Sequence, residues 1–217
     1  MWERALQDVL PGLRKLVPKG SRVLEIGYGD GLLSCCLCLD LGWNIVGLEV
    51  SREACAKAVE HAKRFEVDDC VEFHCCDPEK TRKHQGQYDA VFIKTVLYSS
   101  QTLSEYADWL DWIFSVLRPG GVLINFETGR ANRLTQCYRR MRRRSYTSLC
   151  LYTGKAEALY DERFEIIDRR YYGGWSQFMA PCPPLYSLAS RIEEAIRPCD
   201  ADNSFIVSII ARRPMET

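Results

Sequence analysis

The chain lacks an excess of charge of either sign, a long apolar run and a secretion signal. Its 217 residues carry 29 Lys plus Arg and 29 Asp plus Glu, so the net charge is zero and the chain as a whole has no nucleic-acid signature. No apolar run approaches the ~20 residues that cross a bilayer. The first residues also lack the basic and then apolar order of a signal peptide. These absences predict a cytoplasmic protein without a transmembrane segment.

Cysteine is abundant, but its pattern does not indicate disulfides or a metal site. There are eleven cysteines, an odd number, and only three histidines. Cys35 and Cys38 form a C-x-x-C pair on one predicted helix, away from any histidine. We therefore predict no bound metal and reduced thiols that fill a core. Six of them lie in segments predicted to be buried helices and strands: Cys35, Cys36, Cys38, Cys55, Cys70 and Cys75.

Strand and helix patterns alternate along most of the chain, after an amphipathic helix at 1–17. Alternation of this kind predicts βαβ units and a mostly parallel sheet in a single domain. The predicted strands are 22–27, 44–49, 71–75, 88–93, 121–126, 164–172 and 204–211. The predicted helices between them are 32–41, 52–65, 103–117 and 186–196.

A glycine-rich turn follows the first predicted strand, and an acid stands about twenty residues on. Gly27, Gly29 and Gly31 lie between that strand and a helix, an arrangement that lets backbone N–H groups approach a nucleotide-like ligand. A dinucleotide fold would place its third glycine at position 32, which is Leu32. Glu25, just before the turn, suits a cationic ligand and is a poor neighbour for a pyrophosphate. Spacing and charge both argue against NAD.

Residues 23–31, Val-Leu-Glu-Ile-Gly-Tyr-Gly-Asp-Gly, resemble the first motif of class I S-adenosylmethionine-dependent methyltransferases, particularly the small-molecule, type 11 branch. The resemblance continues in order through most of residues 20–127, including Leu-Arg-Pro-Gly-Gly at 117–121. It implies S-adenosylmethionine as cofactor and a Rossmann-like α/β fold. The implied sheet has seven strands in the order 3-2-1-4-5-7-6, the last of them antiparallel, with helices on both faces.

The same resemblance implies a set of cofactor-binding residues. Glu49 would bind the ribose hydroxyls, Val50 would pack on adenine, and Asp77 would accept from the adenine amino group. Lys94 ends the fourth strand, and the end of that strand would pass the methionine part of the cofactor. Lys94 has two open roles: it contacts a carboxylate of the cofactor or substrate, or it only caps its strand. The full set is Glu25, Gly27, Tyr28, Gly29, Gly31, Glu49, Val50, Cys76, Asp77, Pro78 and Lys94.

The resemblance divides the single domain, 1–217, into an N-terminal helix (1–18), a cofactor-binding core (20–128), a substrate lid (129–160) and C-terminal strands that complete the sheet (161–217). Aromatic residues of the C-terminal half either line an acceptor pocket or pack the lid onto the sheet. They are Tyr146, Tyr152, Tyr172, Trp175 and Phe178.

Methyl transfer from a sulfonium needs the acceptor held in line, and a general base only for a hydroxyl or a protonated amine. Candidate bases are Lys94, Tyr98, Glu127 and Asp89, although we expect Asp89 at the start of its strand, away from the site. The sequence assigns the catalytic role to none of them.

Seven arginines lie within residues 130–144. Four roles are open for these arginines. They could form a solvated helix face, recognise a phosphate or carboxylate of the substrate, contact an anionic membrane surface transiently, or bind RNA. The neutral net charge counts against RNA or any other nucleic acid as a partner.

The sequence thus predicts methyl transfer to oxygen, nitrogen or carbon of a small metabolite, including an anionic one, or of a glycan or lipid precursor. The alternatives are a catalytically idle cofactor-binding partner protein and an RNA methyltransferase that uses the arginine run. Arsenite methylation would need three converging thiols. An aminopropyltransferase would need acids where Lys-Thr-Val-Leu stands at 94–97. The sequence leaves the oligomeric state open.

Overall fold

The computed structural model describes residues 2–76, 87–129, 154–173, 182–195, 200 and 204–215. No helix within these ranges is long and apolar enough to span a membrane. The helices are α1 (Trp2–Leu16), α2 (Leu32–Leu41), α3 (Arg52–Arg64), the short η2 (Leu97–Ser99), α4 (Leu103–Val116), α6 (Gly154–Asp161) and α7 (Pro183–Ala195). The strands are β1 (Arg22–Ile26), β2 (Asn44–Glu49), β3 (Val71–Cys75), β4 (Tyr88–Lys94), β5 (Leu117–Thr128), β6 (Glu165–Tyr172) and β7 (Ile206–Arg212).

The strands form one seven-stranded sheet in the order β3-β2-β1-β4-β5-β7-β6. The first five are parallel, and β7 runs antiparallel to both β5 and β6. The predicted strand order and the antiparallel last strand are confirmed. Because β1, β2, β4 and β5 are parallel, their carboxyl ends meet at one edge of the sheet, where the loops after them can form a site.

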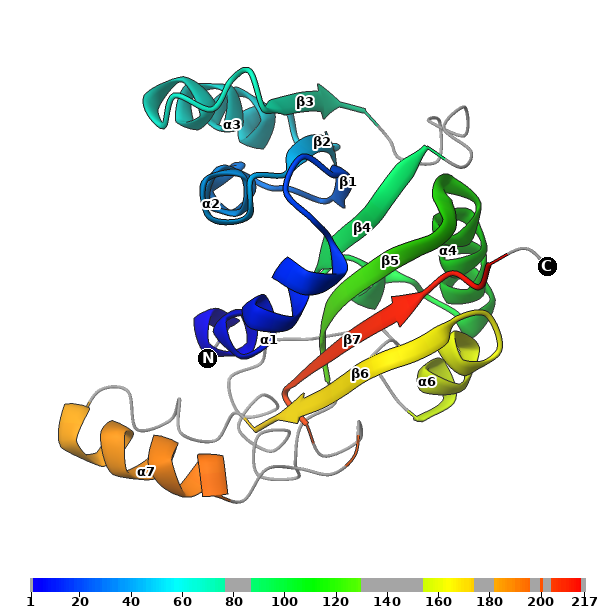
Figure 1. Cartoon of the computed structure of the whole chain (residues 1–217). Coiled ribbons are helices and arrows are strands. Elements are labelled where there is room, and N and C mark those ends of the chain that lie inside the picture. Colours follow the sequence, from blue (N-terminus) through cyan, green and yellow to red (C-terminus); the bar gives the residue numbers. More distant parts are fainter. Residues whose placement is uncertain are drawn as a thin grey trace.

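Helices cover both faces of the sheet, and alternate strand residues supply two separate cores (Figure 1). On one face, α1, α2 and α3 pack on side chains such as Val23, Phe92 and Ile124. On the other face, α4 and α6 pack on Leu24, Val91 and their neighbours. Strands buried on both sides read as continuous apolar runs, which is why the sequence pattern located them.

Local signals set the helix boundaries. The Ser51 hydroxyl accepts from the Ala54 N–H at 3.3 Å and begins α3, and Thr102 accepts from the Glu105 N–H at 3.1 Å and begins α4. Gly42 ends α2 in the left-handed conformation, and its N–H donates to the Cys38 carbonyl. These caps account for the agreement of the predicted and observed starts of α3 and α4.

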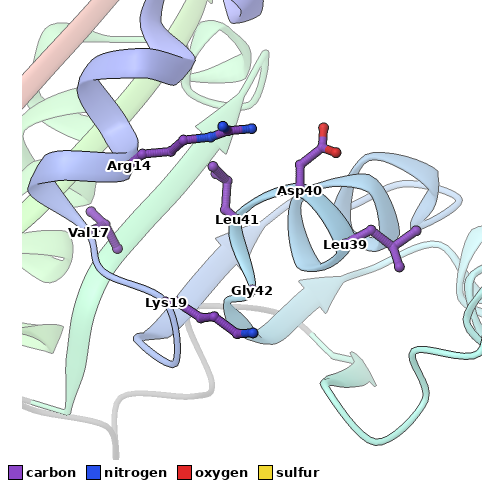
Figure 2. A pocket seen from close by; sticks show the side chains of 7 residues that line it. All are labelled: Arg14, Val17, Lys19, Leu39, Asp40, Leu41 and Gly42. Atoms are coloured by element: carbon purple, nitrogen blue, oxygen red, sulfur yellow. The ribbon is translucent and has the colours of Figure 1, made fainter.

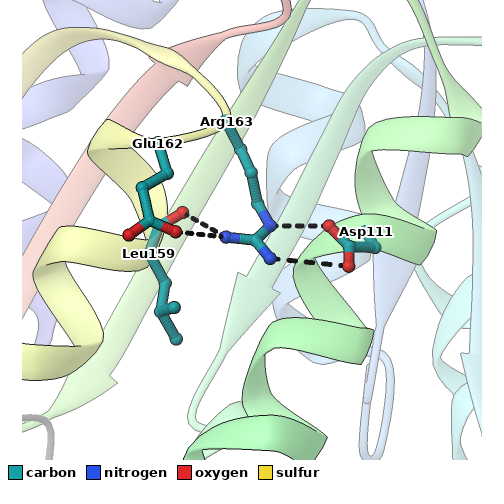
Figure 3. A network of polar contacts seen from close by, with 4 residues as sticks. All are labelled: Asp111, Leu159, Glu162 and Arg163. Carbon is teal, nitrogen blue, oxygen red and sulfur yellow. Dashed lines mark hydrogen bonds and ion pairs between the residues drawn. The ribbon is translucent and has the colours of Figure 1, made fainter.

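Two features differ from the sequence prediction. β5 begins at Leu117, because the Pro-Gly-Gly segment predicted as a turn continues the strand, with a shift in its pairing to β4 between Tyr88 and Ala90. Residues 154–161, at the end of the predicted lid, form α6, and Arg163 just after it bonds to Asp111 of α4 at 2.6 Å (Figure 3). The second core buries Tyr160 of α6 completely.

The prediction that all six cysteines of the α/β segments are buried was wrong for three of them. Cys35, Cys38 and Cys55 are buried, whereas Cys70 is half-buried, and Cys36 and Cys75 are exposed. Cys36 lies on the outward face of α2, and Cys75 ends the edge strand β3. The eight cysteines within the described residues are all free thiols, and those residues hold no cluster of three or more groups able to bind a metal.

Candidate functional site

The turn after β1 has a backbone that requires glycine. Gly27, Gly29 and Gly31 all have positive φ, at 72°, 60° and 72°. A Cβ on Gly27 would overlap Cγ2 of Val96, and one on Gly31 would lie 2.7 Å from the Cβ of Ala58. A side chain at either position would therefore be strained and would also collide. The turn is a close-packed bend at the start of α2, with its N–H groups at the carboxyl edge of the sheet.

Glu49, at the end of β2, braces this turn. Its Oε2 accepts from the Gly29 N–H at 3.1 Å, and its Oε1 accepts from the N–H groups of Val50 and Ser51, both at 2.9 Å. A carboxylate oxygen has two lone pairs, so Oε2 can accept one further hydrogen bond from a ligand hydroxyl. The sequence prediction placed Glu49 at the ribose, and the structure adds that it also fixes the glycine turn.

Glu25, at the end of β1, is a buried carboxylate with only 3% of its surface exposed. Ser34 of α2 donates to its Oε2 at 2.5 Å. Burial raises the pKa of Glu25 to about 7, although the Ser34 hydrogen bond and the positive charge of Lys94 lower it. A carboxyl group that is poised to ionise near neutral pH and lies behind the turn suits a cationic ligand. Nothing in the sequence pattern indicated Ser34 as its partner.

The end of β4 brings Lys94 next to the same edge. The Lys94 ammonium lies 5.6 Å from the ring centroid of Trp2, a cation–π contact that ties the start of α1 to this edge. Lys94 also acts electrostatically on Glu25. The structure therefore brings Trp2, Lys94 and Glu25 together. The sequence prediction gave the N-terminal helix as substrate-facing but did not name Trp2 among the site residues.

Tyr28 and Val50, two predicted site residues, differ in their exposure. Tyr28 is 4% exposed, its ring lies 4.5 Å from that of Phe73, and its hydroxyl donates to the His74 carbonyl at 3.4 Å. Its side chain thus packs the turn onto β3, and its backbone is what the turn presents. Val50 is 64% exposed and lies directly after β2.

The remaining predicted residues divide into those the structure describes and those it does not. Cys76 is half-buried, and its N–H donates to the Glu49 carbonyl at 2.8 Å. Tyr172 is buried and donates to the Ala5 carbonyl at 3.4 Å, so it packs on α1. Asp77, Pro78, the side chain of Tyr98, the arginine run 130–144, Tyr146, Tyr152, Trp175 and Phe178 lie outside the described residues.

Two of the candidate bases have partners. Asp89 begins β4 at the opposite edge, as expected, where it accepts from the Arg22 N–H at 2.8 Å and from Arg118 at 2.7 Å. Glu127, near the end of β5, is 1% exposed and accepts from the N–H groups of Val96 and Leu97. Asp89 is therefore too remote to act on a ligand at the carboxyl edge.

A cavity of ≈310 Å³ lies at the other end of α2 (Figure 2). Because α2 has ten residues, this cavity is about 15 Å from the glycine turn along the helix axis. Apolar and charged side chains both line it, and none of the predicted cofactor-binding residues is among them. Its lining residues are Arg14, Val17, Lys19, Leu39, Asp40, Leu41 and Gly42.

A seven-stranded sheet of this order, with a glycine turn after β1 and a carboxylate ending β2, defines the class I methyltransferase fold. Residues 23–121 match the family model described as "Methyltransferase domain". Residues 23–121 are thus similar to methyltransferase domains, and the fold around them is the class I methyltransferase fold.

Individual relatives agree with this assignment. The chain is similar to sterol 24-C-methyltransferase of Saccharomyces cerevisiae, with 27% identity over 112 residues, which is 51% of this chain and 28% of that protein. The matched part amounts to 28% of that protein and to 32% of a second curated relative. Most of the length of both relatives therefore has no counterpart in this chain.

Solved structures share the fold at lower sequence identity. A geranyl diphosphate methyltransferase in complex with S-adenosylmethionine has a TM-score of 0.69 at 20% identity, with 96% of this chain and 84% of that chain covered. The [4+2]-cyclase SpnF has a TM-score of 0.67 at 22% identity, with 99% and 84% covered. Since one of these two neighbours is named as a cyclase, the fold alone does not decide the reaction.

Proposed function

We propose that this protein binds S-adenosylmethionine at the carboxyl edge of its sheet and transfers the methyl group to oxygen, nitrogen or carbon of a small-molecule acceptor. The observation that carries the proposal is the glycine turn, braced by Glu49 and backed by the buried Glu25. A dinucleotide would bring a pyrophosphate against Glu25, which opposes that alternative. The methyltransferase-domain match over residues 23–121 supports the choice of reaction.

The cofactor set predicted from the sequence fits this edge in its described part. Glu25 would face the positive charge of the amino-acid end, and Glu49 would bind the ribose diol with the lone pair that the turn leaves on Oε2. Gly27, Gly29 and Gly31 allow close backbone approach, and Tyr28 would contribute its backbone. Val50, Cys76 and Lys94 complete the described part of the set, and Asp77 and Pro78 remain predictions.

The cofactor supplies an activated methyl group on a sulfonium, so the chain has mainly to position the acceptor and exclude water. Trp2 and Lys94, which contact each other, would stand beside the methionine end of the proposed pocket and border the acceptor. By its name, one related protein acts on a sterol, which is apolar, and another acts on geranyl diphosphate, which carries a diphosphate group. These names support a small-molecule acceptor and do not specify which one.

We further propose the division into an N-terminal helix (1–18), a cofactor-binding core (20–128), a lid (129–160) and C-terminal strands (161–217), with α6 as the part of the lid segment that packs on α4. A cytoplasmic location and transient contact of the arginine run with a membrane surface remain predictions. So do the idle cofactor-binding protein and the RNA methyltransferase as alternative functions.

Calorimetric titration with S-adenosylmethionine and S-adenosylhomocysteine tests the proposal, with NADH as the negative ligand. We expect micromolar binding of both adenosyl ligands and none of NADH. Glu49→Gln removes one carboxylate oxygen from the turn and should weaken binding at least about tenfold. Glu53→Gln, at an exposed position of α3, is the matched control and should bind like the wild type. Absence of binding by the wild type would contradict the proposal.

Catalysis is tested separately by the formation of S-adenosylhomocysteine from S-adenosylmethionine in pools of candidate acceptors, including small metabolites, isoprenoid diphosphates and RNA. Turnover with a small molecule supports the proposed reaction. Turnover with RNA alone would favour the RNA methyltransferase, and tight binding without turnover on any pool would favour the idle binding protein.

A further inference from the structure

Two carboxylates are fully buried within the described residues, and both lie at the carboxyl edge of the sheet. They are Glu25, which backs the glycine turn, and Glu127, near the end of β5. Burying a carboxylate is unfavourable unless hydrogen bonds or charges compensate it. The proposed function uses Glu25, but it gives Glu127 no role beyond that of a candidate base.

Glu127 binds the backbone of the segment that follows β4. Its Oε1 accepts from the Val96 N–H at 3.2 Å and from the Leu97 N–H at 2.9 Å. The neighbouring residue of β5 acts on the same segment, because the Phe126 carbonyl accepts from the Thr95 N–H at 2.8 Å. The end of β5 therefore holds residues 95–97 through three consecutive backbone N–H groups.

The segment that these bonds hold is strained. Thr95 has a φ of 55°, in the left-handed region that β-branched residues rarely adopt. Such a conformation persists only where the surrounding structure imposes it, and it is found often at functional sites. The Phe126 carbonyl holds the Thr95 N–H, and Glu127 holds the N–H groups of both following residues, so Glu127 supplies two of the three hydrogen bonds that impose this conformation.

Residues 95–97 in turn contact the glycine turn. Val96 Cγ2 fills the space where a Cβ on Gly27 would lie, so the two segments are packed as closely as backbone and side chain allow. Lys94, directly before the segment, acts on Glu25. A displacement of residues 95–97 would therefore alter the end of the pocket between Gly27, Glu25 and Lys94.

We propose that Glu127 is a positioning residue, which holds residues 95–97 against Gly27 and so shapes the part of the pocket that receives the amino-acid end of the cofactor. Its carboxylate acts on the backbone rather than as a general base. The inference rests on the proposed cofactor site, and it assigns Glu127 a role in binding that acts through Val96.

The test compares Glu127→Ala and Glu127→Gln with two ligands. S-adenosylhomocysteine carries the amino-acid end, whereas 5′-methylthioadenosine lacks it and contacts only the adenosine part of the pocket. The glutamine carbonyl oxygen can still accept from both N–H groups, so Glu127→Gln is the conservative rescue. Calorimetry gives the affinities, and the melting temperature of each variant without ligand reports its folding.

We expect Glu127→Ala to bind S-adenosylhomocysteine at least about tenfold more weakly, because two hydrogen bonds to a charged acceptor are lost. Its affinity for 5′-methylthioadenosine should stay within about threefold of the wild type, and Glu127→Gln should stay within about threefold for both ligands.

Three outcomes would overturn the inference. They are wild-type affinity of Glu127→Ala for S-adenosylhomocysteine, equal losses for both ligands, and a Glu127→Gln variant as weak as Glu127→Ala. Failure of the wild type to bind S-adenosylhomocysteine is a different result, which contradicts the proposed function itself.

Discussion

Carboxylates at the two edges of the parallel sheet differ in their exposure and in the groups that bind them. At the amino edge, Asp89 is about one-third exposed and is paired with Arg118, with its second oxygen on the Arg22 N–H. At the carboxyl edge, Glu25 and Glu127 are buried; Glu25 accepts a hydrogen bond from a hydroxyl, and Glu127 accepts from backbone N–H groups. The amino edge compensates its charge within the protein, whereas Glu25 keeps a raised pKa that a cationic ligand would lower.

Backbone strain follows the same division in part. Positive φ occurs at both edges. At the amino edge it falls on Gly20, Gly42 and Gly120 and on Glu66; a Cβ on Gly20 would meet nothing within 4 Å, whereas one on Gly42 or Gly120 would meet the side chain of Lys19 or Met215. At the carboxyl edge it falls on Gly27, where a Cβ would overlap Val96, and on Thr95, which has a side chain. The contacts at the amino edge come from the long, flexible side chains of Lys19 and Met215, whereas the contact at Gly27 comes from the short, β-branched Val96, which has less freedom to move away.

The largest expected effect is that of Gly27→Ala. It combines left-handed strain with the overlap on Val96, so it should lower the free energy of unfolding by roughly 2–4 kcal/mol and S-adenosylhomocysteine affinity by about 100-fold or more. Chemical denaturation and calorimetry measure the two effects. Gly20→Ala, with strain but no overlap, is the matched control and should cost only about 1 kcal/mol with affinity unchanged. Equal effects of the two substitutions would break the comparison.

Glu25→Gln should change how stability depends on pH. The folded-state pKa of about 7 lies above the ordinary value of 4.5, so the folded protein binds the proton more tightly than the unfolded chain. The stability that this proton contributes is fully present below pH 4.5 and is lost as pH rises through 7, up to about 3 kcal/mol. Glu25→Gln should thus be more stable than the wild type at pH 8, measured by denaturation without ligand, and this gain should vanish near pH 4.5.

The same carboxyl group should make cofactor binding depend on pH. If the ionised Glu25 faces the ammonium of the bound ligand, S-adenosylhomocysteine affinity should fall by up to about tenfold for each pH unit below 7. The affinity of Glu25→Gln should be lower at pH 8 and nearly flat over this range. Calorimetry between pH 5.5 and 8 gives both curves, and an identical slope in the two proteins would show that another group carries the dependence.

The smallest effect is expected at the amino edge. Asp89→Asn removes the charge of a half-exposed ion pair but leaves an oxygen to accept from Arg22, so it should cost less than about 1 kcal/mol. It should not alter S-adenosylhomocysteine affinity. A clear loss of affinity in this variant, with unfolding unchanged, would mean that Asp89 is coupled to the site after all.

The sequence was informative where a structural feature requires a particular type of residue. Continuous apolar runs located the strands, the three glycines located the turn, and the family resemblance supplied the strand order, which the residues alone did not. The position of Asp89 at the start of its strand was also predicted correctly, because it follows from counting along β4.

The features that the sequence did not indicate depend on contacts between distant segments. Glu127 meets Val96 and Leu97 only because β5 lies beside β4 in this register, and nothing near Thr95 in the sequence signals its positive φ. The exposure of Cys75 was missed although the predicted strand order already placed β3 at the edge of the sheet. The Pro-Gly-Gly segment was interpreted as a turn because its composition is that of a turn, although it continues β5.

Hydrogen–deuterium exchange of the full chain with and without S-adenosylhomocysteine tests the central claim most directly, because it compares the two edges in one experiment. The account predicts slower exchange on ligand addition at residues 27–31, 49–51 and 95–97. It predicts no change at residues 18–22 and 117–121 of the amino edge. No slowing at the carboxyl edge, or slowing confined to the residues around the cavity at the far end of α2, would contradict it.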